Sequence, residues 1–186
     1  MNVKLAWIGL ILLIYGITST VLSYPNLYSW NIELFDSGTV PIAAISSNKH
    51  GFYASVGFVK KVEVVVNNGP WGMPSMWGDC YWIRHPFGIS LLNEQGSSLT
   101  VLTQTSPPVT HVFDVPNTWN SLAGVRIDNP ETFPVAVEVT VIFHSQIPNL
   151  YWQTIFYIGL ISTAIGIILT GVAVRKKQTI YKPPPP

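Results

Sequence analysis

Charge is scarce in this chain. Only 10% of its 186 residues are Asp, Glu, Lys or Arg, against about 25% in an ordinary soluble domain. A nucleic-acid-binding surface needs many basic side chains, and a disordered chain combines low hydropathy with high net charge, so both classes are excluded. A hydrophobic content of 48% and a formal net charge of +1 also argue against a plain cytosolic enzyme.

Cysteine is nearly absent, since Cys80 is the only one. A single cysteine excludes a disulfide within the chain and leaves two readings. Either the thiol is buried as a small apolar side chain, which we expect, or it pairs with another chain. The sequence also lacks a Gly-x-Ser-x-Gly elbow and a glycine-rich phosphate loop. We therefore expect no enzymatic activity and no cofactor.

One arrangement keeps a redox alternative open. Cys80 and His85 are separated by four residues, and a copper site combines a thiolate, imidazoles and a weak axial ligand such as methionine. Met73 and Met76 precede Cys80, however, and no methionine follows His85. Cupredoxin-like proteins have the order Cys, His, Met. We therefore expect no metal ligands and retain a copper subunit only as an alternative.

Two uncharged apolar runs frame the sequence, at Leu5–Ser23 and Ile155–Val174. A helix rises 1.5 Å per residue, so each run makes a helix of about 30 Å, the thickness of the bilayer hydrocarbon. Tyr151, Trp152 and Tyr157 lie near the start of the second run, and such rings favour the headgroup level. The sequence thus predicts two transmembrane helices with a lipid bilayer as partner.

The charges predict how the chain crosses the membrane. All nine acidic residues lie between Glu33 and Glu138. The residues that flank the two runs are basic instead: Lys4, Arg175, Lys176, Lys177 and Lys182. Because basic flanks stay cytoplasmic, we expect both termini inside and the middle of the chain outside.

The predicted organisation has five parts, in a multi-pass protein of the cell membrane. They are a cytoplasmic N-terminus (1–4), a transmembrane helix (5–23), an extracytoplasmic β-sandwich domain (24–150), a second transmembrane helix (151–174) and a basic, proline-ended cytoplasmic tail (175–186). A cleaved signal peptide is the alternative for residues 5–23. The middle is extracytoplasmic under either reading.

The middle predicts an all-β sandwich, Ig-like or jelly-roll-like. Val135–His144 alternates between apolar and mostly polar positions, which is typical of a half-buried strand. Turn-forming residues such as Asn67-Asn68-Gly69-Pro70 separate many of the other segments. Nine further strands are expected, at Tyr28–Phe35, Ile42–Ser46, Tyr53–Val59, Lys61–Val66, Cys80–Ile83, Gly88–Leu92, Leu99–Gln104, Val109–Val115 and Ala123–Ile127.

Part of this series follows a family-like order. It runs through His85-Pro86-Phe87-Gly88, Val112–Pro116, Leu122–Pro130 and Val135–Phe143, followed by an apolar run. In this it resembles the GOLD-type β-sandwich of membrane-anchored secretory cargo receptors. Cys80 lacks the paired cysteine of those receptors, no coiled coil precedes the run, and Lys176-Lys177 is not at the extreme end. The resemblance therefore implies the fold and not the trafficking role.

The most unusual local segment is Pro70–Gly78. Its glycines and prolines oppose regular structure, so its large side chains either fold onto the sandwich or stand out as an adhesive patch. We take five residues of this region as a candidate recognition loop: Trp71, Met73, Met76, Trp77 and Trp82.

Small residues recur every seven positions in both apolar runs, and Ser162 lies four positions before Gly166. Such ridges let another helix backbone approach closely, either within the chain or from a neighbour. The candidate helix-packing residues are Gly9, Gly16, Gly159, Ser162 and Gly166.

These patterns favour a membrane-anchored extracytoplasmic binding protein without catalysis. We expect it to be an accessory subunit of a membrane or cell-surface complex, with other membrane or surface proteins as partners and no nucleic acid. The alternatives are a membrane-anchored copper subunit and a structural anchor of a surface layer.

Overall fold

The chain forms two compact units. The computed structural model describes residues 3–76 and 78–178. One unit comprises Met1–Ser29 and Ile147–Pro186, and the other is Trp30–Gln146. Among the described residues the first unit is mainly helical and the second is built from strands.

The helical unit contains α1 (Val3–Ser23), a short 3-10 turn η1 (Tyr24–Asn26) and α2 (Leu150–Gln178). Pro25 ends the α-helical pattern because proline has no N–H to donate. Val3–Asn26 and Leu150–Val174 are long and apolar enough to cross a membrane. Only 11% of each apolar window is buried inside the protein, so most of this apolar surface faces outward, unlike that of a core helix.

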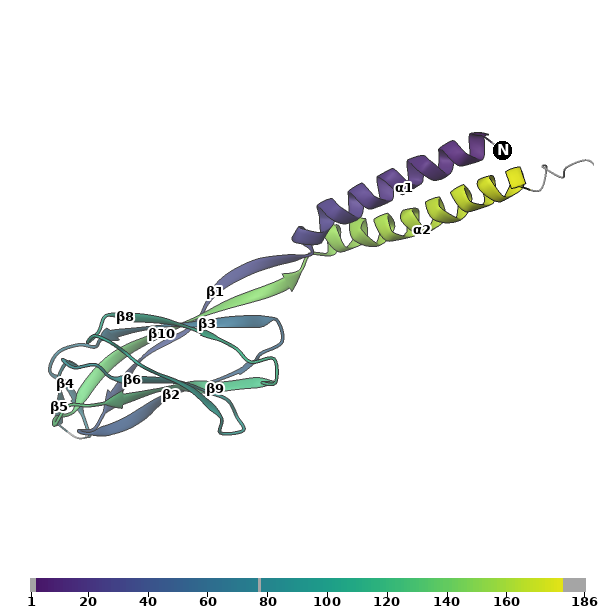
Figure 1. Cartoon of the computed structure of the whole chain (residues 1–186). Helices are drawn as coiled ribbons and strands as arrows, with labels where there is room; N and C mark the ends of the chain where they lie inside the picture. Colours follow the sequence, from purple (N-terminus) through teal and green to yellow (C-terminus); the bar gives the residue numbers. More distant parts are fainter. Residues whose placement is uncertain (1–2, 77, 179–186) are drawn as a thin grey trace, which may run out of the picture. The chain divides into compact units, whose positions relative to one another are not determined.

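The other unit is a sandwich of two four-stranded sheets (Figure 1). One sheet has the order β1 (Tyr28–Ile42), β10 (Val135–Pro148), β3 (Val59–Asn68), β8 (Val109–Asp114). The other has the order β2 (Ser46–Ser55), β9 (Ser121–Asn129), β6 (Gly88–Leu92), β7 (Ser98–Leu102). A separate hairpin joins β4 (Met73–Ser75) to β5 (Gly78–Cys80).

The strands of the sandwich pair in a nested order. β1 neighbours β10, β2 pairs with β9, β3 with β8, and β6 with β7. A nested set of this kind is one long hairpin rolled across two sheets, which is the jelly roll. The expected β-sandwich is therefore confirmed, and its topology is the jelly-roll type and not the Ig-like one. The GOLD family itself stays a prediction.

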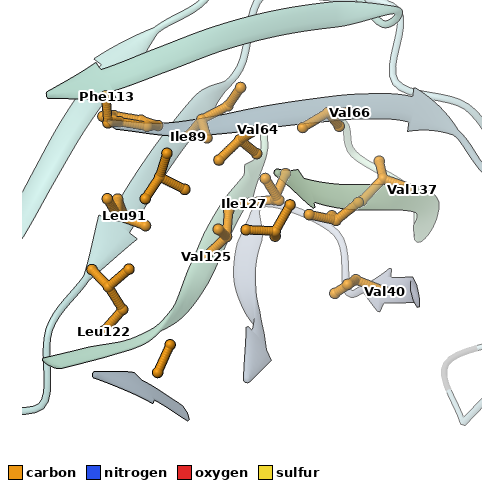
Figure 2. Packing of buried hydrophobic residues seen from close by; sticks show 14 of the residues in the cluster. Val40, Val64, Val66, Ile89, Leu91, Phe113, Leu122, Val125, Ile127 and Val137 are labelled. Atoms are coloured by element: carbon orange, nitrogen blue, oxygen red, sulfur yellow. The ribbon is translucent and has the colours of Figure 1, made fainter. Parts of the chain in front are cut away.

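The core lies between the two sheets and follows the alternation of the strands. Side chains such as Val64, Ile89, Ile127 and Val137 point toward one another from both sheets (Figure 2). Val135, Val137, Val139 and Val141 have no exposed surface, and Phe143 has 7%, as the pattern predicted. Burying each such Val or Ile side chain stabilises the folded state by about 1.5–3 kcal/mol relative to leaving it exposed.

Three expected strands are absent or interrupted in the structure, and most of the others differ in their limits by one or more residues. Ile42–Ser46 is not a strand, because β1 ends at Ile42 and β2 begins at Ser46. Tyr53–Val59 is divided by a turn at Gly57, whose φ is 34°. Of the expected strand Cys80–Ile83, only Cys80 lies in a strand, as the last residue of β5. Tyr81 makes an isolated bridge to Val135.

The turn between β1 and β2 contains a strained residue. Ile45 has a φ of 42°, a conformation that costs a β-branched residue about 1–3 kcal/mol. Its backbone N–H donates to the Glu131 carbonyl oxygen at 2.8 Å, which helps to hold this conformation. The side chain is 73% exposed, so core burial does not offset the strain.

Replacing Ile45 with glycine should therefore stabilise the sandwich. We expect Ile45→Gly to raise the free energy of unfolding by about 1 kcal/mol, since relief of strain exceeds the entropy cost of glycine. Thermal unfolding of the detergent-solubilised chain, followed by circular dichroism, measures this change. Ala44→Gly, at a neighbouring residue without positive φ, should leave stability equal or lower. A destabilised Ile45→Gly variant would contradict the strain.

Candidate functional site

Three loops meet at the end of the sandwich where β10 begins. Tyr81 bridges Val135, and the Gly69 N–H donates to the Ala136 carbonyl oxygen at 2.9 Å. The Ile45 N–H donates to Glu131 just before β10. We term this end the loop face and define it by Ile45, the segments 69–76 and 78–87, and the segment 130–134. Gln146 lies near the other end of the same strand.

Large apolar side chains stand out from the loop face. Trp71 is 66% exposed, Trp82 47% and Met76 86%, beside the 73% of Ile45. Met76 lies in the two-residue turn of the β4–β5 hairpin, between Ser75 and Gly78. The sequence left open whether the large side chains of the candidate recognition loop fold onto the sandwich or stand out. Trp71, Met76 and Trp82 stand out.

Two residues of the candidate loop need separate mention. Trp77 lies outside the described residues. Met73 pairs through its backbone with Cys80 across the β4–β5 hairpin. The hairpin therefore holds the backbone on both sides of the Met76 turn in a fixed register.

The exposed rings are held in place by specific contacts. The Trp82 Nε1–H donates to the Gly69 carbonyl oxygen at 2.9 Å. The Trp71 ring meets Tyr81 edge to face at 6.1 Å between centroids, and Tyr81 meets Phe133 at 5.6 Å. Edge-to-face pairs of this kind stabilise a fixed ring orientation. The aromatic surface is thus ordered before any ligand binds.

Asn129 joins two of the loops at the base of this surface. Its Nδ2 donates to the Ala43 carbonyl oxygen at 2.8 Å and to the Phe133 carbonyl oxygen at 2.9 Å. Its Oδ1 accepts the Glu131 N–H at 2.9 Å. The side chain is 3% exposed, and a buried amide with all these partners satisfied fixes the loop geometry.

Glu131 joins the third loop to the same base. The Oε1 atom accepts the Arg84 N–H at 2.6 Å and the His85 N–H at 3.1 Å. Nδ1 of the His85 ring lies 3.0 Å from each carboxylate oxygen. The Glu131 side chain is 4% exposed, whereas that of His85 is 70% exposed. The buried carboxylate therefore acts as the acceptor that anchors residues 84–85.

The surroundings of Glu131 favour its charged form. Burial by itself raises the pKa of this carboxyl. The hydrogen bonds from the Arg84 and His85 backbone and from the His85 ring, with the charge of that ring, outweigh burial and hold the pKa below its ordinary 4.5. Sequence reasoning missed Glu131, because nothing in its local pattern marks a buried acid.

Cys80 and His85, the residues considered for copper, have other surroundings in the structure. Cys80 is fully buried and forms no disulfide, as expected for a small apolar side chain. The His85 ring is engaged with Glu131. Within residues 3–76 and 78–178, no three His, Cys, Asp or Glu side chains are grouped to hold a metal ion.

The helical unit brings the glycines of α1 and α2 against each other. A Cβ atom on Gly16 would lie 2.5 Å from the Thr163 backbone nitrogen and 2.6 Å from the Gly159 carbonyl oxygen. A Cβ atom on Gly9 would lie 2.9 Å from the Thr170 nitrogen. The residue numbers rise on one helix as they fall on the other, so the helices pack antiparallel with backbones in close approach.

Threonines accompany these glycines. Thr20, Thr163 and Thr170 each donate a hydroxyl to the carbonyl oxygen four residues earlier, at 2.8–2.9 Å. Those carbonyls belong to Gly16, Gly159 and Gly166. Each hydroxyl is therefore satisfied within its own helix, as an apolar environment requires. The close backbone contacts occur at the glycines of the seven-residue repeat. Ser162, the other candidate packing residue, is half-buried.

Comparison with known proteins finds only distant structural likenesses. No protein-family model and no curated protein matches the chain. Among solved structures, AlgX of Pseudomonas aeruginosa is 14% identical with a TM-score of 0.36, covering 59% of this chain and 26% of that one. The xylan-binding module CBM86 of Roseburia intestinalis is 14% identical (TM-score 0.37, 64% and 85% covered). The BFDV capsid protein is 5% identical (TM-score 0.39, 63% and 99% covered).

The Glu131 carboxylate should make stability depend on acid pH. Its lowered pKa gives stabilisation that is complete above the ordinary pKa and is lost as the pH falls through the folded-state value. We expect Glu131→Gln to lower the free energy of unfolding at neutral pH by about 1–3 kcal/mol and to flatten the acid dependence. Urea unfolding across pH values tests this. Glu138→Gln, at an exposed strand position, serves as control; equal losses in both variants would contradict the assignment.

The glycine contacts predict a selective effect in the helices. Gly16→Ile should force α1 and α2 apart and cost about 1–3 kcal/mol. Gly171→Ile is the matched control, because a Cβ atom there meets nothing within 4 Å. Loss of helical circular dichroism during SDS titration of the full chain measures both. Equal midpoints for the two variants would show that the helices do not depend on this contact.

Proposed function

We propose that this protein is a non-catalytic, membrane-anchored binding protein whose sandwich is extracytoplasmic. In this proposal α1 and α2 cross the cell membrane and the loop face docks onto a protein partner in a membrane or surface complex. Both termini are cytoplasmic. The single observation that carries the binding role is the exposed set of Trp71, Met76, Trp82 and Ile45 on the loop face.

The composition of the helices supports the anchor. Only 11% of each candidate span's apolar window is buried inside the protein, and long apolar helices with so little cover are not stable in water. Basic residues flank the runs, and the acidic residues are confined to the middle. The charge asymmetry favours cytoplasmic termini.

The chemistry of the loop face supports protein recognition. Trp and Tyr dominate the energetics of protein interfaces, because large rigid rings bury much area at little entropy cost. Met76, with its flexible thioether, adapts to the shape of a partner. Trp82 is held by its contact with Gly69, and Trp71 by its contact with Tyr81. Because these side chains are already restrained, binding a partner costs them less conformational entropy.

A photo-crosslinking amino acid at position 76 tests the proposal in living cells. Met76 is the most exposed of these side chains, so the substitution should not disturb the fold. We expect crosslinks to one discrete protein, and we expect Trp71→Ala to reduce them severalfold because it removes a large part of the contact. The same probe at Gln95, an exposed residue of another loop, is the control.

The outcomes separate the functions. Crosslinks that are equal at positions 76 and 95, or that ignore Trp71→Ala, would contradict recognition by the loop face. Crosslinks between copies of this chain would instead support a structural surface-layer anchor.

A further inference from the structure

A cavity lies at the end of the sandwich away from the loop face, between residues 55–60 and residues 115–120. The Phe58 carbonyl oxygen accepts the Gln146 N–H at 2.8 Å, so the turn between β2 and β3 lies beside the later part of β10. The cavity has a volume of about 370 Å³, near the lower end of the range of roughly 300–1,000 Å³ for small-molecule sites. Its size therefore suits a ligand of one ring.

Backbone hydrogen bonds hold the two walls of the cavity together. The walls are the β2–β3 turn and the β8–β9 connection. The Val56 N–H donates to the Asn120 carbonyl oxygen at 3.0 Å, and the Val115 N–H donates to the Lys60 carbonyl oxygen at 2.9 Å. Because each bond crosses from one wall to the other, the spacing of the walls is fixed without a ligand.

Lys60 is the extra residue of a β-bulge in β3. His144 pairs with Lys61 and Ser145 pairs with Val59, so Lys60 has no counterpart on β10. A bulge takes one residue out of the regular alternation of a strand and redirects its side chain, and bulges are frequent beside functional sites. The redirected residue here lines the cavity.

The charge of Lys60 is not balanced by an acidic side chain. Its Nζ atom lies 3.5 Å from Asn117 Oδ1, at the limit of a hydrogen bond. No carboxylate of residues 3–76 and 78–178 forms an ion pair with it, whereas the next residue, Lys61, pairs with Asp114 at 3.5 Å. All nine acidic residues of the chain belong to the sandwich, but none of them lines the cavity. The cavity is therefore positively charged and suits an anion.

The other groups of the lining suit a ring that carries hydroxyls. Ser55, Asn117 and Asn120 supply a hydroxyl and two amides, which both donate and accept hydrogen bonds. Four apolar side chains, each at most 9% exposed, also line the cavity: Val56, Val59, Val115 and Trp119. Polar groups beside an apolar surface fix the orientation of a small ligand that has both kinds of surface.

We propose that this cavity binds a hydroxylated carboxylic acid the size of one sugar ring, such as a hexuronic acid. The Lys60 amine donates a charge-assisted hydrogen bond to the carboxylate. The Ser55 hydroxyl and the amides of Asn117 and Asn120 bind the ring hydroxyls, and the apolar side chains contact the ring carbons. Either a free acid or the terminal residue of an acidic glycan carries this group. The site is separate from the loop face and does not depend on a protein partner there.

Isothermal titration calorimetry of the full chain, in a detergent without a sugar headgroup, tests the proposal. The ligands are glucuronate and galacturonate, with glucose as the ring that lacks a carboxylate. Methyl glucuronide stands for the end of a glycan. Lys60→Met removes the charge from the cavity. Lys61→Met is the matched control, because it removes the same charge from the next residue, which does not line the cavity.

We expect saturable binding of at least one hexuronate, about tenfold weaker or more in Lys60→Met and unchanged in Lys61→Met. Equal binding of methyl glucuronide and glucuronate would support a glycan end as the ligand, and binding of the free acid alone would support a free acid. No saturable binding of either hexuronate, equal binding of glucose, or equal affinities in Lys60→Met and Lys61→Met would each overturn the inference.

A second variant keeps the test decisive if circular dichroism shows that Lys60→Met does not fold. Asn117 is exposed, so Asn117→Ala should fold, and we expect it to weaken hexuronate binding severalfold through loss of a hydrogen bond. Unchanged affinity in Asn117→Ala would then overturn the inference. Trp71→Ala, on the loop face, should leave hexuronate binding unchanged, so failure of the proposed function and failure of this inference are distinguishable.

Discussion

The pairing of the first strand with the last is the constraint on which the structure depends. β1 and β10 are neighbours in one sheet, so the two chain segments that lead to the helices leave the sandwich on adjacent strands. The Asn149 N–H donates to the Leu27 carbonyl oxygen immediately before α2 begins, which holds the two segments together at the start of the helices. Two apolar segments that are more than a hundred residues apart in sequence can thereby pack as one antiparallel pair, as their facing glycines require.

A few buried hydrogen bonds likewise hold the loop face together. Asn129 and Glu131, two residues apart, collect three loops through buried hydrogen bonds. Buried polar groups are costly when left unsatisfied, and here they are matched by backbone donors and acceptors. The result is a set of exposed rings on a rigid base, and the strained Ile45 backbone is part of the same arrangement. Strain of this kind persists where the surrounding structure fixes it.

Periodicity made part of this architecture predictable. The alternation of Val135–Phe143 gave a correct strand with the correct buried side, and the two apolar runs correspond to α1 and α2. Turn positions were less predictable, because Ala43 and Ala44 carry none of the side chains that mark a turn. The sequence also could not reveal Glu131, since its role arises from backbone donors some 46 residues away along the chain. Long-range contacts of that kind leave no local pattern.

The location of the sandwich is the claim on which the proposed function depends. The most direct measurement is labelling of Gln95→Cys, at an exposed loop position, with a membrane-impermeant thiol reagent on intact cells. The natural Cys80 is buried and should stay unlabelled until the protein is denatured. An extracytoplasmic sandwich predicts full labelling at position 95 before the cells are permeabilised. Labelling that occurs only after permeabilisation would place the sandwich in the cytoplasm and contradict the account.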